Sequence, residues 1–213
     1  MSDLIAQAKP ACAKYVEGKD GMAQLRIGLI IGSTRTNRFA DVAADWMMAS
    51  AAARTDLRLE VLDLRSQNLP FLDEPTAPAF TGGVFARPEA EAWRARLAPL
   101  DGFIATVAEY NHGPTAVLKN ALDSAYLEWH RKPIAFVGYG GAGGLRAIQQ
   151  LRAIVIGLQM APLKQDVSIS MEAFLAARDG APLEDYAHLV QARQALFDSL
   201  IWWASALKAA RAA

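Results

Sequence analysis

A short apolar run at residues 27–31 leads directly into a turn of small, hydroxyl and basic residues at 32–38. An apolar run without alternation is typical of a strand that is buried on both faces, as in a parallel sheet. A helical pattern starts near Phe39, so the segment is a strand–turn–helix unit. Parallel strands are joined by crossover helices, and this junction therefore predicts an α/β fold.

The turn itself is suited to an anion. A helix N-terminus presents unpaired N–H groups and a partial positive charge. Ser33 adds a hydroxyl donor, and Arg35 and Arg38 could bind phosphate oxygens bidentately. The turn lacks the lysine and the spacing of a Walker-type triphosphate loop. The residues alone therefore predict a monoester phosphate site, which would fit nucleotides, flavins and sugar phosphates.

The rest of the chain alternates strands and helices. The patterns predict strands at 57–64, 102–108, 133–137 and 164–169, and helices at 38–54, 88–97, 115–126, 145–157 and 183–209. Such alternation predicts a parallel sheet with right-handed crossovers and helices on both faces. The longest irregular segment, residues 66–87, is rich in Pro and Gly, and a loop of that length is usually functional or a subunit contact.

Composition indicates one compact domain and excludes several classes of partner. The 213 residues are 53% hydrophobic, so we expect residues 25–213 to form a single domain behind an N-terminal extension, residues 1–24, which is either a short helix or poorly ordered. Basic and acidic residues balance at 22 each, so no global field recruits nucleic acid or an anionic membrane. No apolar stretch reaches the roughly 18 residues that span a bilayer. A single cysteine, Cys12, fits a reducing cytoplasm and excludes a multi-cysteine metal site.

Two further loops follow predicted strands, at the sheet edge where open α/β sheets bind ligands. In the first, residues 108–114, backbone groups together with Tyr110 and Asn111 could recognise the polar edge of a planar heterocycle. The alternative is a capped turn in which Asn111 bonds locally.

The second loop, residues 138–144, contains five glycines among seven residues. Its backbone could pass against a flat ligand or make a tight turn. Tyr139 could stack on that ligand or cover the neighbouring helix. The run also satisfies the dinucleotide fingerprint, but on the fourth strand rather than the first, with Asp166 inside the next strand. A flavin-free NAD(P)-binding dehydrogenase therefore stays open as an alternative.

Three motifs together carry a family resemblance. They are Gly-Ser-Thr-Arg-x-x-Arg after the first strand, Glu-Tyr-Asn-His followed by Leu-Lys-Asn-Ala-Leu-Asp at 118–123, and the glycine-rich loop ending in Gly-Leu-Arg. Their order from about residue 25 to 169 resembles the NADPH-dependent FMN reductase family, whose relatives include flavin-dependent quinone, azo and chromate reductases. The resemblance implies a flavodoxin-like three-layer αβα sandwich with a parallel five-stranded sheet in order 2-1-3-4-5, and FMN at the switch between the first and third strands.

The resemblance also implies roles for individual residues. Those that would hold the FMN phosphate are Ser33, Arg35, Asn37 and Arg38. Those that would border the isoalloxazine ring are Glu109, Tyr110 and Asn111, mostly through main-chain groups, with Gly140 and Gly141 beside the same ring. The chain departs from the family at Ala108, where Pro is usual, and at Ser124, where Trp is usual.

The expected activity follows from these cofactors. NADPH or NADH would pass a hydride to bound flavin, and a quinone, azo, metal-ion or flavin acceptor would take the electrons. The hydride step needs no acid–base residue, and no catalytic triad or metal site is expected, because His112, His130 and His188 lack ligand spacing. The alternative is a flavodoxin-like electron-transfer protein without its own NAD(P)H activity. Such carriers usually have an uncharged phosphate loop, and Arg35 and Arg38 argue against that alternative.

The predicted C-terminal helix, residues 183–209, carries apolar residues on more than one face, including the adjacent Trp202 and Trp203. The surplus predicts a subunit interface, and the alternative is a broad core face in a monomer. The family resemblance implies a homodimer or homotetramer.

Overall fold

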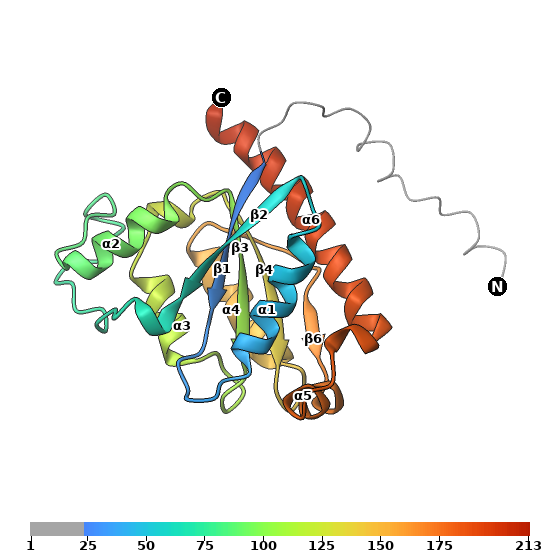
Figure 1. Ribbon diagram of the computed structural model, residues 1–213. Coiled ribbons are helices and arrows are strands. Elements are labelled where there is room, and N and C mark those ends of the chain that lie inside the picture. The colour runs from blue at the N-terminus through green and yellow to red at the C-terminus, as the bar shows by residue number, and fades with distance from the viewer. Residues whose placement is uncertain (1–23) are drawn as a thin grey trace, which may run out of the picture.

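The computed structural model describes residues 24–213, so the predicted extension, apart from Gln24, lies outside the described residues. The strands and helices follow in the order β1 (Leu25–Ile31), α1 (Ala40–Ala51), β2 (Leu57–Asp63), α2 (Pro88–Leu97), β3 (Gly102–Ala108), α3 (Ala116–Asp123), β4 (Pro133–Tyr139), α4 (Leu145–Gly157), β5 (Ala161–Pro162), β6 (Val167–Ile169), α5 (Met171–Arg178) and α6 (Ala187–Ala212) (Figure 1). Strands and helices thus alternate as the sequence predicts as far as α4, after which β5 is followed by β6 and α5 by α6.

Within the described residues, six strands form one parallel sheet in the order β2-β1-β3-β4-β5, with β6 also paired to β4. This confirms the predicted flavodoxin-like order. The fifth position is shared by two short strands, because β5 pairs with the start of β4 and β6 pairs with its end. Between them, Arg152 of α4 donates hydrogen bonds to the carbonyls of Leu163 and Lys164, each at 3.2 Å. These carbonyls bond a side chain instead of a neighbouring strand, so the predicted strand at 164–169 is shortened.

Helices cover both faces of the sheet and make two hydrophobic cores (Figure 1). On one face, α1, α5 and α6 pack through side chains such as Met47 and Phe197. On the other, α2, α3 and α4 enclose Trp93, Phe103 and Trp129, which are almost completely buried. Strands β1, β3 and β4 run between the two cores, which is why they are continuous apolar runs. The three-layer sandwich is therefore as predicted.

Helix α5 is not among the predicted elements. It begins at Ser170, whose hydroxyl accepts a hydrogen bond from the Ala173 N–H at 3.2 Å. Only Ala173 and Ala177 of this helix are fully buried. The large apolar residues Met171 and Leu175 are 41% and 50% exposed, so the apolar pattern of this short helix does not mark its core-facing side. The residues predicted for the C-terminal helix instead begin with a short 3₁₀ turn, Leu183–Asp185, before α6.

The irregular segment at 66–87 is held on α3 by Asn120, from the Leu-Lys-Asn-Ala-Leu-Asp motif. Its side-chain amide donates to the Pro70 carbonyl at 2.8 Å, and its oxygen accepts from the Leu72 N–H at 3.1 Å. Phe71, between these two residues, and Phe80, farther along the segment, are 75% and 85% exposed. The segment thus packs on the domain by its start and presents aromatic side chains to solvent. Among residues 24–213, no helix is both long enough and apolar enough to cross a membrane.

Candidate functional site

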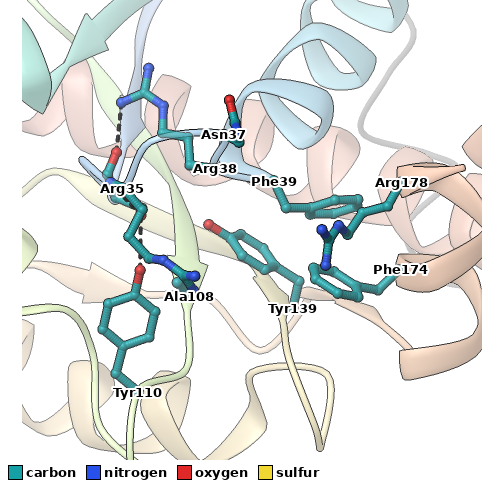
Figure 2. A pocket seen from close by; sticks show the side chains of 10 residues that line it. Arg35, Asn37, Arg38, Phe39, Ala108, Tyr110, Tyr139, Phe174 and Arg178 are labelled. Carbon is teal, nitrogen blue, oxygen red and sulfur yellow. Dashed lines mark hydrogen bonds between the residues drawn. The ribbon is translucent and has the colours of Figure 1, made fainter. Parts of the chain in front are cut away.

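A pocket of about 410 Å³ of open space lies where the carboxyl ends of β1, β3 and β4 meet (Figure 2). The predicted residues that line it are Ser33, Arg35, Asn37, Arg38 and Tyr110. The pocket therefore forms at the sheet edge that the α/β topology predicts, and the residues predicted to bind phosphate make one of its walls.

The turn between β1 and α1, residues 32–39, is anchored at its start by two threonines. The N–H of Gly32 donates to the Thr106 hydroxyl of β3 at 3.0 Å, and the Thr115 hydroxyl donates to the Gly32 carbonyl at 2.5 Å. A Cβ atom at Gly32 would lie 2.2 Å from the Thr106 carbonyl oxygen, so only glycine fits there. The turn therefore leaves the sheet from a closely defined position.

Arg38 belongs to the turn, but its side chain is directed into the protein and is only 3% exposed. Its Nη1 and Nη2 atoms donate bidentately to the Asp63 carboxylate, at 2.7 and 2.6 Å. Nε donates to Asp41 at 2.8 Å, and Nη1 also donates to the Ser33 carbonyl at 2.6 Å. This hydrogen bonding by Arg38 holds the pKa of Asp63 below its usual range. With Nη2 also 2.7 Å from Asp41, all the N–H groups of the guanidinium face protein oxygens.

Arg35 has the opposite environment. It is exposed, and among residues 24–213 it forms no ion pair. Its guanidinium carbon lies 5.9 Å from the centre of the Tyr110 ring. The Tyr110 hydroxyl in turn lies 3.2 Å from the Ser33 hydroxyl, which joins the loop after β3 to the turn after β1. Arg35 is thus free to meet an anion at the pocket.

The N-terminus of α1 is also available. Phe39 occupies the N-cap position and supplies no side-chain hydrogen bond, so the first N–H groups of the helix lack a side-chain cap. Asn37 precedes it in the left-handed region at φ 54°, which asparagine tolerates better than most residues. The turn therefore adds main-chain donors to the charge of Arg35, a donor set that suits a phosphate.

The loop after β3 is a tight two-residue turn. Tyr110 and Gly113 exchange two main-chain hydrogen bonds, at 2.9 and 3.0 Å. Between them, Asn111 and His112 have φ values of 50° and 69°, as such hairpin turns require. Asn111 and His112 are exposed, and Asn111 does not line the pocket.

The Glu109 carboxylate is directed to α4 rather than to the pocket. It accepts hydrogen bonds from the Arg146 N–H at 3.0 Å and from the Arg146 guanidinium at 2.8 Å. Burial raises the pKa of Glu109, but the bonds from Arg146 and the nearby N–H of Ala147 lower it more, so the net pKa is below the usual range. Glu109 therefore caps the start of α4 as a carboxylate.

The glycine-rich loop owes most of its glycines to close packing. A Cβ atom at Gly143 would lie 2.0 Å from the Ser168 hydroxyl, and one at Gly144 would lie 2.7 Å from Gly138 Cα. Both residues also have positive φ angles. Gly140 lies beside Glu109, whereas a Cβ at Gly141 would meet nothing within 4 Å. Of these glycines, Gly141 leaves its backbone open to an approaching ligand, although neither it nor Gly140 lines the pocket.

The far wall of the pocket consists of residues outside the predicted site. Tyr139 packs against Phe39 and Phe174, with ring centres 5.1 and 6.2 Å away. Its hydroxyl is buried, points toward the β1–α1 turn in Figure 2, and has no hydrogen-bond partner within residues 24–213. Burial raises the pKa of this phenol, which is therefore neutral and able to donate. Phe174 and Arg178 come from α5 and could not be placed here without that helix.

Among residues 24–213, no group of three or more His, Cys, Asp or Glu side chains is arranged to hold a metal ion. The donors at the pocket are instead guanidinium, hydroxyl and main-chain N–H groups. This set fits a phosphate ester with an organic body, because the neutral and cationic donors sit beside aromatic rings.

Comparisons with known proteins agree with this geometry. The sequence is 36% identical over 154 residues to an NAD(P)H-dependent FMN reductase of Schizosaccharomyces pombe, covering 72% of this chain and 74% of that protein. It is 29% identical over 149 residues to a 2-hydroxy-1,4-benzoquinone reductase of Burkholderia sp, covering 66% and 75% of the two chains. In fold, it resembles the flavoenzyme NAD(P)H:(acceptor) oxidoreductase FerB of Paracoccus denitrificans, with a TM-score of 0.65, 20% identity, and coverage of 85% and 97%. The profile of the NADPH-dependent FMN reductases matches residues 25–173, and the chain belongs to that family.

Proposed function

We propose that this protein is an FMN-dependent NAD(P)H oxidoreductase that passes electrons to a small-molecule acceptor of the quinone, azo, metal-ion or flavin type. The observation that carries the proposal is the pocket at the carboxyl edge of the sheet. There, one space is surrounded by an arginine and a phenol that have no ion-pair or hydrogen-bond partner within residues 24–213, and by a helix N-terminus without a side-chain cap. The same edge holds flavin and nucleotide ligands in doubly wound sheets generally. Family membership and a quinone-reducing relative support this class of activity.

In this proposal the phosphate of FMN occupies the β1–α1 turn. Ser33, Arg35 and Asn37 contribute a hydroxyl, a guanidinium and the main chain that leads into α1. Arg38 contributes differently, because its donors are already used by Asp63, Asp41 and the Ser33 carbonyl. We therefore assign Arg38 the role of holding the turn in shape, and Arg35 the role of direct contact with the phosphate.

The isoalloxazine ring would extend from the turn along the ends of β3 and β4. Tyr110 and the exposed main chain at Asn111 would border it on the β3 side, with Glu109 supporting the loop through α4. Gly140 and Gly141 would lie beside it on the β4 side, where Gly141 leaves open space. When bound, FMN supplies two-electron chemistry between a nicotinamide and the acceptor. The protein's contribution is to hold the ring and leave one face open to each small molecule in turn.

We further propose that residues 25–213 act as one domain, in a homodimer or homotetramer in the cytoplasm. Trp202 and Trp203 on α6 are 50% and 40% exposed, and exposed aromatic side chains are typical of interface cores. Phe71 and Phe80 add apolar surface from the long segment at 66–87. Light scattering of the purified protein measures the oligomeric state.

Anaerobic reduction tests the proposed function directly. The purified full-length protein is loaded with FMN, and its oxidised-flavin absorbance is followed after NADPH is added without oxygen. We expect the band to bleach, and to return when a quinone is added. A band that never bleaches, despite bound FMN, would overturn the proposal in favour of an electron-transfer protein reduced by a partner. A protein that takes up no FMN would overturn both.

A further inference from the structure

Helix α5 supplies the wall of the pocket that faces the β1–α1 turn, and its pocket-lining residues lie beyond the family match. The family profile ends at residue 173, whereas the side chains that line the pocket are Phe174 and Arg178. Residues four apart lie on the same side of a helix. Ala173 and Ala177 fix α5 against the core, so the pair is held facing the pocket (Figure 2).

Arg178 is held in place by an aromatic face and not by a carboxylate. Its guanidinium carbon lies 5.8 Å from the centre of the Phe174 ring. Phe174 is itself fixed by Phe39, with ring centres 4.6 Å apart. In the described part of the chain, Arg178 forms no ion pair, whereas Arg38 of the turn is fully paired. A positioned but unpaired guanidinium at a pocket rim is a binding group for an anion.

The Tyr139 hydroxyl points to the same conclusion independently. Its residue is 6% exposed, and the hydroxyl is buried without a hydrogen-bond partner among residues 24–213. An unsatisfied buried hydroxyl destabilises a folded protein unless a ligand or water supplies the partner. Tyr139 lines the pocket between the turn and α5, so a ligand oxygen there would satisfy it. A phosphomonoester offers several such oxygens and two negative charges.

We propose that Arg178 and the Tyr139 hydroxyl, opposite Arg35, form a second half of a phosphomonoester site, so that α5 determines how strongly the protein prefers phosphorylated ligands. The inference rests on the proposed function. Two phosphomonoesters are relevant to that function: the 5′-phosphate of FMN and the 2′-phosphate of NADPH. They share the chemistry that Arg178 would recognise, and each has an analogue that lacks the phosphate, riboflavin and NADH.

The test compares these pairs of ligands in Arg178→Ala and Tyr139→Phe, using the full-length protein. The second variant keeps the ring that packs on Phe39 and Phe174 and removes only the hydroxyl. Lys164→Ala is the matched control, because it removes one exposed positive charge that does not line the pocket. Dissociation constants for FMN and riboflavin come from quenching of flavin fluorescence. Apparent dissociation constants for NADPH and NADH come from the dependence of the rate of anaerobic flavin reduction on nicotinamide concentration.

We expect Arg178→Ala to weaken one phosphorylated ligand by about tenfold or more, and its unphosphorylated analogue by less than about twofold. Tyr139→Phe should weaken the same ligand by about threefold to tenfold, and Lys164→Ala should change neither. A loss confined to FMN over riboflavin places the flavin phosphate at α5, and one confined to NADPH over NADH places the nicotinamide phosphate there.

Equal weakening of a ligand and its unphosphorylated analogue in Arg178→Ala would overturn the inference, and so would unchanged binding of both pairs. Neither result would contradict the proposed function, provided that the wild-type protein binds FMN and is reduced by NADPH. If the wild-type protein fails in those two measurements, the proposed function fails first.

Discussion

Arg35→Ala and Arg38→Ala remove the same charge from the same turn, yet the structure predicts opposite consequences. Arg35 is exposed, and its guanidinium carbon lies 5.9 Å from the centre of the Tyr110 ring. Arg38 is buried and joins the turn to the end of β2 through Asp63. We expect loss of Arg35 to impair phosphate binding with little effect on stability, and loss of Arg38 to destabilise the protein.

The magnitudes follow from burial. Removing one partner of a buried ion pair costs about 3–5 kcal/mol. The carboxylates here are partly wet, with Asp63 28% and Asp41 47% exposed, so water can replace part of what Arg38 provides. We therefore expect Arg38→Ala to lower the free energy of unfolding by about 2–3 kcal/mol, which is roughly 4–12 °C in Tm for a domain of this size. Arg35→Ala loses at most one exposed cation–π contact, worth about 0.5–1 kcal/mol.

The effect on FMN binding should have the opposite order, with the larger loss in Arg35→Ala. A hydrogen bond to a charged group is worth about 1.5–3 kcal/mol, so Arg35→Ala should raise the dissociation constant for FMN by about 10-fold to 150-fold. Riboflavin, which lacks the phosphate, should bind Arg35→Ala as it binds the wild type. Urea unfolding of the flavin-free protein gives the first quantity, and flavin titration gives the second.

Asp63→Asn is the matched control for Arg38, because it breaks the pair without removing a cation. It should reproduce most of the stability loss of Arg38→Ala, and the double variant should lose less than the sum of the two. The lowered pKa of Asp63 also means that its stabilising contribution is present above its ordinary value, about 3.9, and is lost as pH falls through the lower folded value. The reasoning is refuted if Arg38→Ala keeps wild-type stability but loses FMN selectively over riboflavin. Its guanidinium would then turn to the phosphate.

Three further outcomes are expected from other parts of the molecule. Gly143→Ala should lower the free energy of unfolding by about 2–4 kcal/mol, because a Cβ there meets Ser168 and φ is positive. Gly141→Ala should change the free energy of unfolding by no more than about 0.5 kcal/mol, but should weaken the binding of FMN and of riboflavin equally. Asn120→Ala should cost about 1–3 kcal/mol and hasten limited proteolysis within residues 66–87, since the amide holds that segment on α3. Burial lowers the pKa of Lys132 to about 8, while the unfolded chain keeps that proton to about pH 10.4. Stability by urea unfolding should therefore rise by about 1.5 kcal/mol between about pH 8 and 9.5, and this rise should be absent in Lys132→Met.

The sequence predicts most of the fold because the information is local. The runs at β1, β3 and β4 are apolar without interruption, since each strand is covered on both faces, and the helices at α2 and α4 match their predicted bounds. The misses depend on contacts between distant segments. The break between β5 and β6 is stabilised by Arg152, a side chain from another helix. Of helix α5 only Ala173 and Ala177 are fully buried, so its core-facing side does not stand out in the sequence.

The sequence predicts where the site lies but not which role each of its residues has. A strand that ends in a turn of small and basic residues indicates where an anion would bind, and the pocket lies there. Which arginine is free depends on Asp63, which ends β2 and pairs in register with Ile31 at the end of β1. That pairing is a property of the sheet, invisible in the turn itself. Tyr139 is similar, because its packing against Phe39 and Phe174, and the lack of a hydrogen-bond partner for its hydroxyl within residues 24–213, depend on segments far apart in the sequence.

The difference in burial explains why Arg35 and Arg38 cannot take each other's role. A guanidinium that is 3% exposed is tolerated only if carboxylates compensate it, and Asp63 and Asp41 together supply more negative charge than Arg38 supplies positive charge. Arg38 therefore brings precise geometry to the turn but no net attraction for a dianion. Within residues 24–213, the arginines that line this pocket without forming an ion pair are Arg35 and Arg178, so we expect the attraction to come from them. We therefore expect buried groups to determine where a phosphate binds, and exposed groups to determine how strongly it is held.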